Sequence, residues 1–221
     1  MFFRDRGDAA RKLAAALDPW SGKNPLVLGI PRGAISMART IADELGGEVD
    51  VVLVRKLRAP GNPEYAIGSI DESGWSYLAP YAQSAGATPD YVEAEKARQH
   101  EAIMQRRTAY TGQRGALDPA GRIVIVVDDG LATGSTMIAA LHGLRLRQPA
   151  RLICAVPVAP PETIERIRPY ADEIVCLHAP ENFYAVGQFY RDFPQVDDKE
   201  VIKALTPLRS GPLPPKDGEG T

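Results

Sequence analysis

Short, nearly continuous apolar runs alternate along the chain with longer stretches whose apolar residues recur at helical spacing. Each such run predicts a buried strand, because a strand covered on both faces lacks the polar alternation of a half-exposed one. The helical stretches between them favour an α/β fold with a doubly wound, parallel five-stranded sheet. The predicted strands are Leu26 to Ile30, Val49 to Val54, Arg122 to Val127, Arg151 to Val156 and Glu173 to Leu177.

The predicted helices have recognisable ends. Asp8 is a suitable N-cap for the first of them, and Pro19 prevents its extension. Gly46-Gly47 ends the second. The third is charged, and its candidate inward contacts are Tyr91, Ala94, Ala97, Ile103 and Met104. The predicted helices are Ala9 to Leu17, Ala34 to Leu45, Pro89 to Tyr110, Met137 to Leu144 and Glu162 to Tyr170.

Two segments do not fit this alternation. The Gly- and Pro-punctuated stretch from Arg55 to Ala87 is too long for an ordinary connection and indicates a functional loop or an insertion. Residues 206–221 are rich in Pro, Gly and charge, so we expect a disordered tail. We therefore predict a single domain that comprises residues 1–205.

Composition and charge narrow the function classes. The net charge of −2 provides no basic field for nucleic acid. No apolar run approaches the ~20 residues that span a bilayer, and the charged start does not resemble a signal peptide, so we expect a cytoplasmic protein. Cys154 and Cys176 lie in apolar runs, which favours buried free thiols over a disulfide. The three histidines show no metal-ligand spacing.

The most informative segment is residues 124–136. Asp128 and Asp129 follow a buried strand, at the end where open α/β sheets bind their ligands. Small and hydroxyl residues then open an apolar helix whose free amides are suited to phosphate. Paired acids beside a phosphate cradle suggest a ribose 5-phosphate ligand, although the segment also suits an ordinary strand, turn and helix. The P-loop lysine and the dinucleotide-binding glycine pattern are both missing.

This segment resembles the phosphoribosyl pyrophosphate (PRPP) signature of type I phosphoribosyltransferases, whose adenine-type members carry two Asp followed by L-L-A-T-G-G-T. The resemblance implies that Asp128 and Asp129 hold the ribose 2′ and 3′ hydroxyls. It also implies Mg²⁺, bound mainly through PRPP and without a dedicated protein site. The loop that would bind the 5′-phosphate comprises Gly130, Ala132, Thr133, Gly134, Ser135 and Thr136.

A second motif, Pro31-Arg32-Gly33, closes the first predicted strand. A cation and free amides there are suited to a pyrophosphate, although such a sequence alone is usually just a turn. Adenine-type enzymes carry a Ser-Arg-Gly turn at the equivalent place, as their pyrophosphate loop. The resemblance therefore assigns Arg32 and Gly33 to PRPP binding, and it implies a non-proline cis peptide near Arg32-Gly33.

Arg55-Lys56 closes the second predicted strand. A lone basic pair is often merely solvated. In adenine- and orotate-type enzymes, however, an Arg-Lys pair begins the flexible loop over PRPP, which implies that Arg55 and Lys56, with Arg58, neutralise the departing pyrophosphate. Glu64-Tyr65 resembles a Glu-Tyr of the adenine-type loop, so Glu64 is the candidate acid/base, with a solvent-facing glutamate as the equal alternative.

In this family a small hood packs over the active site and recognises the base. The resemblance places it mainly in residues 180–205, with residues 1–19 as an optional part. This segment carries Phe183, Tyr184, Phe189 and Tyr190, which could stack a planar base or form the core of the hood. A homodimer is an option that the sequence leaves open.

The function implied is transfer of the 5-phosphoribosyl group from PRPP to a nitrogenous base or related small-molecule acceptor, with release of pyrophosphate. Hypoxanthine–guanine enzymes have a third Asp where this chain has Ala132. Nearly the whole chain, to about Leu205, also resembles predicted bacterial phosphoribosyltransferases of unassigned acceptor. Two alternatives stay open: a non-catalytic PRPP-binding regulator and an unrelated sugar-phosphate enzyme on a similar sheet.

Overall fold

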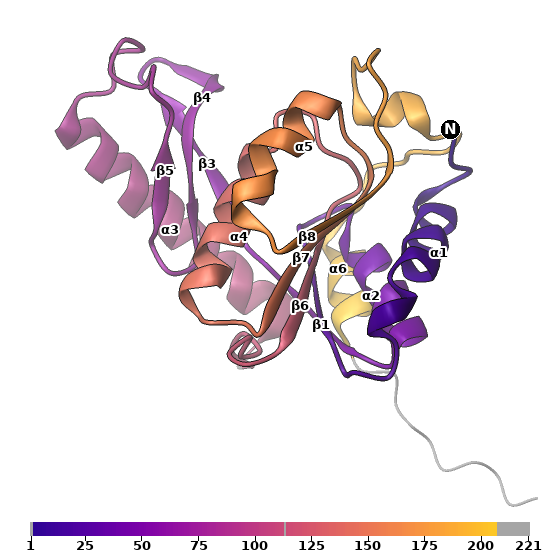
Figure 1. Ribbon diagram of the computed structural model, residues 1–221. Helices are drawn as coiled ribbons and strands as arrows, with labels where there is room; N and C mark the ends of the chain where they lie inside the picture. The colour runs from indigo at the N-terminus through magenta and orange to yellow at the C-terminus, as the bar shows by residue number, and fades with distance from the viewer. Residues whose placement is uncertain (1, 113, 207–221) are drawn as a thin grey trace, which may run out of the picture.

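A parallel five-stranded sheet forms the centre of the protein in the computed structural model, which describes residues 2–112 and 114–206 (Figure 1). Its strands lie in the order β2-β1-β6-β7-β8. Their bounds are β1 Leu26–Gly29, β2 Glu48–Val51, β6 Ile123–Val127, β7 Arg151–Val158 and β8 Glu173–His178. The fold class predicted from the apolar runs is therefore confirmed.

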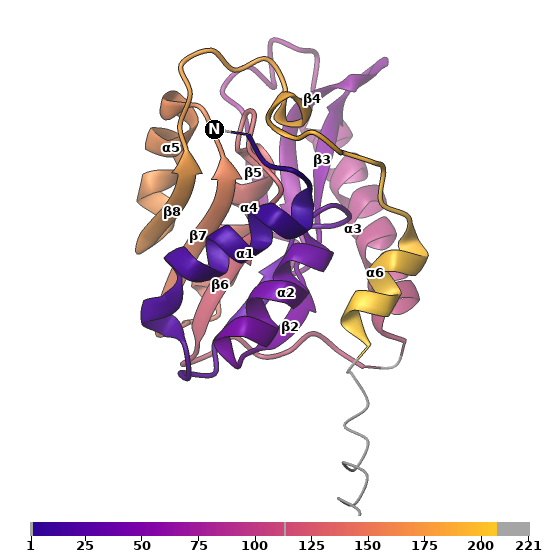
Figure 2. The same ribbon diagram turned by 90° about the vertical axis from the view of Figure 1, so that its right-hand side faces the viewer.

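Helices cover both faces of this sheet (Figure 2). On one face, α1 (Arg6–Ala16) and α2 (Ile35–Leu45) pack on the side chains of Val27, Ile125 and Ile153. On the other, α4 (Ser135–Leu146) and α5 (Pro161–Ile167) pack on Leu26, Val124 and Leu152. Successive strand residues point to opposite faces, so nearly every position of these strands is buried, which explains their continuous apolar sequence.

The segment after β2 corrects the prediction of a second strand reaching Val54 and ending in Arg55-Lys56. β2 ends at Val51, and the chain then builds a separate antiparallel sheet from β3 (Val54–Ala59), β4 (Asn62–Asp71) and β5 (Ser76–Leu78). The β-branched run Val51-Val52 continues across the break, so the sequence pattern could not locate it. The insertion expected from Arg55 to Ala87 is thus an ordered second sheet.

The charged helix α3 (Pro89–Thr111) packs along this second sheet, and the two together are called the arm. Of the five inward contacts predicted for α3, only Ile103 is buried, and the side chain of Met104 is 46% exposed. The inward face consists instead of Val92, Glu95, Gln99, Ile103, Arg107 and Tyr110. Because half of these buried residues are polar, the spacing of apolar residues alone could not predict this face.

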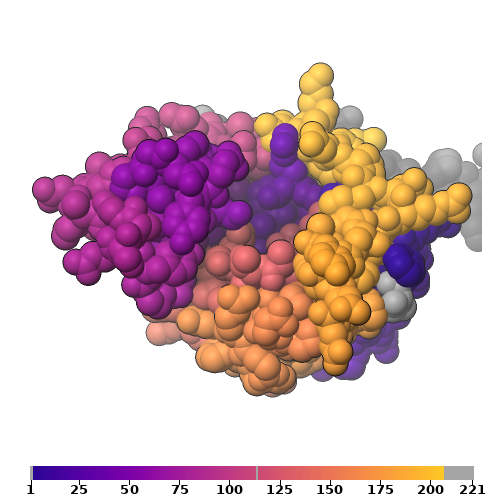
Figure 3. Space-filling model, turned by 90° about the horizontal axis from the view of Figure 1, so that it is seen from above, coloured from indigo at the N-terminus to yellow at the C-terminus, as the bar shows by residue number. Residues whose placement is uncertain are grey.

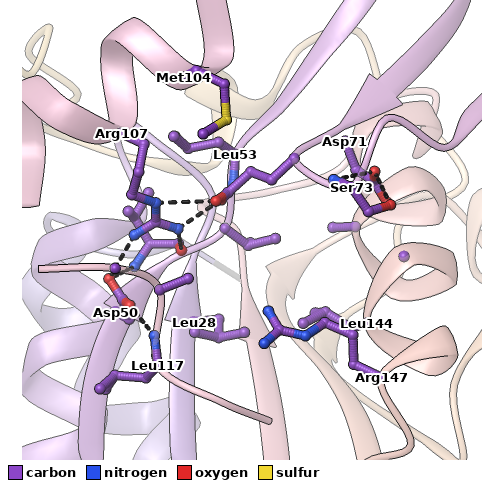
Figure 4. A pocket seen from close by; sticks show the side chains of 17 residues that line it. Leu28, Asp50, Leu53, Asp71, Ser73, Met104, Arg107, Leu117, Leu144 and Arg147 are labelled. Carbon is purple, nitrogen blue, oxygen red and sulfur yellow. Dashed lines mark hydrogen bonds and ion pairs between the residues drawn. The ribbon is translucent and has the colours of Figure 1, made fainter. Parts of the chain in front are cut away.

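Arg107 joins the arm to the central sheet (Figure 4). Its Nη1 donates to Asp50 of β2 at 2.9 Å, and its Nε and Nη2 donate to the Glu72 carboxylate at 3.0 and 2.6 Å. Nη2 also donates to the Val51 carbonyl at 2.7 Å. Arg107 and Asp50 are both buried, so the charges compensate one another away from water.

Both ends of the described chain run beside the central domain. The N-cap of α1 is Asp5, which accepts a hydrogen bond from the Asp8 backbone N–H, so the predicted cap at Asp8 was three residues late. After β8, the chain crosses the top of the molecule and ends in α6 (Asp198–Leu205), which packs against α2 and α3. The predicted disordered tail lies outside the described residues beyond Thr206.

Three smaller predictions concern thiols, histidines and membranes. Cys154 and Cys176 are free, with Cys154 buried and Cys176 half-buried. No group of three or more His, Cys, Asp or Glu within residues 2–112 and 114–206 is placed to hold a metal ion. None of the helices in the described part of the chain is long and apolar enough to cross a membrane.

Candidate functional site

The predicted ribose and pyrophosphate motifs follow two neighbouring strands of the central sheet. Asp128 and Asp129 follow β6, and Arg32 and Gly33 follow β1, which pairs with β6. From β1 the chain winds outward to β2, and from β6 it winds in the other direction to β7 and β8. The strand order therefore reverses between β1 and β6, and ligands of open α/β sheets bind at such a point.

This end of the sheet is hollowed. Seen from above the strand ends, a depression lies between the arm, drawn in purple, and the C-terminal segment, drawn in yellow (Figure 3). Its remaining side is formed by the orange region that contains α5, and indigo atoms of the N-terminal third lie at its floor. The surface thus offers a concave space at the edge where the two motifs end.

The two acids are held by different partners. An oxygen of Asp128, Oδ1, accepts a hydrogen bond from the Asp129 backbone N–H at 2.9 Å. The Oδ2 atom of Asp129 accepts a hydrogen bond from Nε of Arg6 at 2.8 Å, and Nη2 of Arg6 lies 2.8 Å from the same oxygen in an ion pair. The Tyr190 hydroxyl donates to the Asp129 carbonyl at 2.7 Å. The backbone and the carboxylate of Asp129 are therefore both fixed by residues far away in sequence.

Burial dominates the electrostatics of the pair. It raises the pKa of Asp128 well above its usual range, and the neighbouring Asp129 charge raises that pKa further. Burial also raises the pKa of Asp129, while the Arg6 guanidinium acts in the opposite direction. Two adjacent acids with raised pKa values are a typical feature of a functional site.

The predicted phosphate loop leads into α4. Gly134 is its N-cap, with φ +73°, and a Cβ there would come within 2.9 Å of the Thr163 methyl group, so both conformation and space require glycine. The buried Thr163 hydroxyl donates to the Ala132 carbonyl at 2.6 Å and fixes the loop. Thr133 is exposed and its hydroxyl lies 3.3 Å from that of Ser135.

The remaining residues of this loop differ in their exposure. Gly130 is buried, whereas Ala132 is exposed and Thr136 half-buried in the first turn of α4. The first regular helical hydrogen bond is donated by Ile138 to Gly134, so the amides before it point out of the helix start. Amides and hydroxyls here can bind a phosphate without a lysine.

The turn after β1 touches the acidic pair. A Cβ on Gly33 would lie only 2.0 Å from Oδ2 of Asp129 and 3.0 Å from Nε of Arg6, so glycine alone fits. The turn contains a cis peptide between Pro31 and Arg32, one bond before the predicted place near Arg32-Gly33. The two motifs, about a hundred residues apart in sequence, are thus in direct contact.

Arg55, Lys56 and Glu64 come together on the arm, not at the acidic pair. They line a pocket of about 320 Å³ between the β3–β4 hairpin and α3. Nε of Arg55 donates to Gln99 of α3 at 2.7 Å. Burial, followed by the nearby charges of Arg106 and Arg58, lowers the pKa of Arg55. The pocket is therefore rich in positive charge and suited to an anion, with Lys56 and Glu64 exposed.

The aromatic residues of 180–205 have different environments. Phe189 and Tyr190 are buried and pack with Phe3 and Phe183, the Phe3–Tyr190 ring centroids being 5.4 Å apart. Tyr184 is 89% exposed. Of the two roles considered for these rings, packing accounts for Phe183, Phe189 and Tyr190, and Tyr184 is the ring available for stacking. The assignment of 180–205 as the hood stays a prediction.

A further cavity lies on the other side of the arm (Figure 4). It measures about 370 Å³ and is mostly lined by apolar atoms of α3, α4 and the ends of β2 and β4. Leu28, Leu53, Met104, Leu144 and Arg107 are among its lining residues, and none of the residues predicted to bind PRPP is. This cavity is therefore separate from the predicted site.

Sequence reasoning missed several residues that contact the site. Arg6 and Tyr190 reach Asp129 from the two ends of the described chain, and Thr163 reaches Ala132 from α5. Arg106 adds charge to the arm pocket. Arg6 belongs to no motif, so its contact with Asp129 could not be predicted from the sequence. Thr163 lies in a predicted helix, and the sequence could have indicated only that its hydroxyl is buried.

The comparisons with known proteins agree with this geometry. The model of the phosphoribosyl transferase domain matches residues 4–194, and the chain therefore belongs to that family. Among its relatives are two proteins of Mycobacterium tuberculosis, strains CDC 1551 and H37Rv, whose names assign them provisionally to the phosphoribosyl transferases. Each is 40% identical over 204 residues, which is 92% of this chain and 46% of the relative.

A solved structure is similar over almost its whole length. TT1426 from Thermus thermophilus shares 47% sequence identity and superimposes with a TM-score of 0.80, covering 93% of this chain and 98% of that protein. The chain thus spans about half the length of the curated relatives that it matches, but nearly all of TT1426. The family expected from residues 124–136 is confirmed.

Proposed function

We propose that this protein transfers the 5-phosphoribosyl group from PRPP to a nitrogen nucleophile of a small acceptor and releases pyrophosphate. The observation that carries the proposal is the contact between the turn at Gly33 and the carboxylate of Asp129 at the point where the strand order reverses. Membership of the phosphoribosyl transferase family supports it. No feature of the described residues favours the non-catalytic alternative.

In this mechanism the acidic pair holds the sugar. Asp128 and Asp129 accept hydrogen bonds from the ribose 2′ and 3′ hydroxyls, and their negative charge lies near the carbocation-like centre that develops at C1. The phosphate loop, residues 130–136, binds the 5′-phosphate through helix-start amides and hydroxyls. The ribose is thereby fixed at both ends while the bond at C1 breaks.

The leaving group is bound from two sides. Amides of the Arg32-Gly33 turn lie next to the acidic pair and bind the pyrophosphate, assisted by the Arg32 side chain. Arg55 and Lys56 on the arm neutralise the charge that accumulates on the departing pyrophosphate. Arg58 and Arg106 in the same pocket strengthen this positive potential.

Mg²⁺ fits this site only together with the substrate. The described residues contain no cluster of three or more metal-binding side chains, so the donor set suits an ion carried by PRPP rather than a resident one. When bound, the ion would neutralise pyrophosphate charge. The residues that would lie nearest to it are Asp128, Asp129 and Arg32, through the ribose hydroxyls and the pyrophosphate.

The acceptor is constrained by a missing carboxylate and by one glutamate. Hypoxanthine–guanine enzymes have a third Asp, thought to act as the base, at the position of Ala132 in this chain. Because alanine cannot accept a proton, 6-oxopurines should be poor acceptors. Glu64 is exposed at the pocket that also contains Arg55 and Lys56, and we propose it as the group that accepts the proton of the nucleophile. A cytoplasmic location and a homodimer stay predictions.

The experiment is a measurement of pyrophosphate release from PRPP and Mg²⁺ with a panel of purines, pyrimidines and small amides, preceded by a thermal-shift screen. Acceptor-dependent release is expected. A protein that binds PRPP but releases no pyrophosphate with any acceptor would favour the regulator, and one that does not bind PRPP with Mg²⁺ would contradict the proposal.

A further inference from the structure

Arg6, in the first turn of α1, reaches across to the acid that follows β6. Its Nε and Nη2 atoms both lie 2.8 Å from Oδ2 of Asp129. The two side chains are only 12% and 16% exposed, so the ion pair is largely shielded from water. A pair in such a place interacts more strongly than a surface ion pair, because solvent screens it less.

The guanidinium of Arg6 is itself held from two further sides. Its Nη1 donates to the Pro194 carbonyl at 2.7 Å, and its Cζ lies 3.8 Å from the centroid of the Phe193 ring. A planar guanidinium stacked on a ring and bonded at both ends has little freedom to turn. Asp129 is therefore bound to a partner whose own position is fixed.

Each acid keeps one oxygen for a ligand. Asp128 Oδ1 accepts from the Asp129 N–H, and Asp129 Oδ2 accepts from Arg6. Across residues 2–112 and 114–206, the second oxygen of each carboxylate has no protein hydrogen-bond donor. Two adjacent acceptors of this kind suit the two neighbouring hydroxyls of a ribose.

We propose that Arg6 is a positioning residue of the ribose site, which keeps the Asp129 carboxylate ionised and turned so that its free oxygen accepts a hydrogen bond from a sugar hydroxyl. This inference rests on the proposed function. Helix α1, which carries none of the motifs that identify the family, thereby takes part in substrate binding.

The charges around the pair explain why a cation is needed there. Asp129 faces Arg6 from α1, Asp128 from its own loop and the Tyr190 hydroxyl from the segment before Phe193. Burial raises the pKa of both acids, and Arg6 alone of these groups brings positive charge. Without Arg6, the two acids would lower their repulsion by binding a proton or by turning one carboxylate away.

The test compares two ligands that divide PRPP between them. On the proposed function, ribose 5-phosphate binds through hydrogen bonds to the acids, whereas pyrophosphate without Mg²⁺ binds through the Arg32-Gly33 turn and the cations of the arm. Binding of each ligand to the full chain is measured by calorimetry. Arg6→Ala should weaken ribose 5-phosphate at least about tenfold and leave pyrophosphate within about twofold, because a hydrogen-bonded charge is lost at one subsite only. Arg6→Lys should recover part of the loss.

Arg11→Ala is the matched control, because Arg11 is an exposed arginine on the same helix, and it should change neither affinity. A second readout is the pH dependence of ribose 5-phosphate binding: the loss of affinity on acidification should begin at higher pH in Arg6→Ala. Unchanged affinity for ribose 5-phosphate in Arg6→Ala would overturn the role of Arg6, as would an equal loss for both ligands. Wild-type protein that binds neither ligand would overturn the proposed function and this assignment with it.

Discussion

The acidic-pair region and the arm pocket bring charged residues together in different ways. Around Asp129, contacts converge from α1, from the turn after β1 and from Tyr190, and the charged groups are mostly buried. On the arm, Lys56 and Glu64 are exposed, and Arg55 is held by one hydrogen bond to Gln99. In one region the charged groups are held by protein contacts, and in the other they are largely open to solvent.

Substitutions in the two regions should therefore affect substrate binding and reaction rate differently. The acids hold the ribose in the ground state and also stabilise the positive centre that develops at C1, so their loss should lower both affinity and turnover. Exposed cations on long side chains can adjust to a charge that develops during the reaction, so their loss should affect mainly turnover. Substitutions in the two regions can therefore be compared directly.

The largest effect is expected from the acidic pair. Asp128→Asn combined with Asp129→Asn should reduce turnover below about one thousandth of the wild-type rate, because the ribose loses both charged acceptors. The fold should persist, since amides occupy nearly the same volume as carboxylates. Pyrophosphate release and a thermal melt measure the two outcomes.

The control for this variant is Asp118→Asn. Asp118 is an exposed acid in the loop before β6, and it pairs with Arg147. This substitution should leave turnover unchanged. Normal PRPP binding and turnover in the double variant would show that the ribose does not bind at these acids.

A smaller and different loss is expected on the arm. Arg55→Ala or Lys56→Ala should raise the barrier by ~2–4 kcal/mol while weakening PRPP binding much less, because the cations act once the pyrophosphate departs. Steady-state kinetics and PRPP titration separate kcat from affinity. Arg168→Ala, at an exposed arginine that is paired with Glu165 and lies outside the arm pocket, is the control. Equal losses of affinity and rate would instead indicate a ground-state contact.

A panel of acceptors tests the roles of Ala132 and Glu64. Adenine, guanine, hypoxanthine, uracil and nicotinate are tested at matched PRPP and Mg²⁺ in wild type and in Glu64→Gln. We expect guanine and hypoxanthine to react poorly, since Ala132 cannot accept a proton, and Glu64→Gln to slow the best acceptor by about 10²-fold.

Fast guanine turnover in the wild type would make the missing carboxylate irrelevant. Unchanged turnover in Glu64→Gln would remove the glutamate from the mechanism. Glu101→Gln, on the exposed side of α3 and outside the arm pocket, serves as the matched control.

The smallest effect concerns stability and pH. Because the folded-state pKa values of Asp128 and Asp129 are raised, the folded protein binds protons more readily than the unfolded chain. The stability that these acids contribute is present at low pH and is lost as pH rises through their folded pKa values. The Asn double variant should lack this decline, so its free energy of unfolding should fall less than that of the wild type between pH ~4 and pH ~8. Urea unfolding at both pH values measures it, and parallel curves for the two proteins would contradict the raised pKa values.

Residues 124–136 show what could be read from sequence. Strand, acids and helix start are contiguous there, so local pattern alone predicted β6, the loop and the start of α4 within a few residues. The same holds for β1, α2 and the turn between them. These elements depend on short-range geometry and on burial of both sheet faces.

Long-range contacts and half-polar surfaces escaped prediction. The β3–β5 sheet was predicted only as a functional loop or an insertion, because its strands carry Gly, Pro and charge and its exposed hairpin has no continuous apolar run. The inward face of α3 is half polar because Glu95, Gln99 and Arg107 pair with arm and sheet groups. Arg6 reaches Asp129 across 123 positions of sequence, which no local pattern encodes.

The Arg107 junction is a polar attachment between the arm and the central sheet, beside the packing of the arm against α2, α4 and α6. One guanidinium on α3 binds both Glu72 of the arm and Asp50 of the central sheet. Removal of one partner from a buried ion pair costs about 3–5 kcal/mol, so a transplanted arm would need the matching acid in its host. The arm could thus be exchanged between parallel sheets in protein engineering, provided that the aspartate on the edge strand is transferred with it.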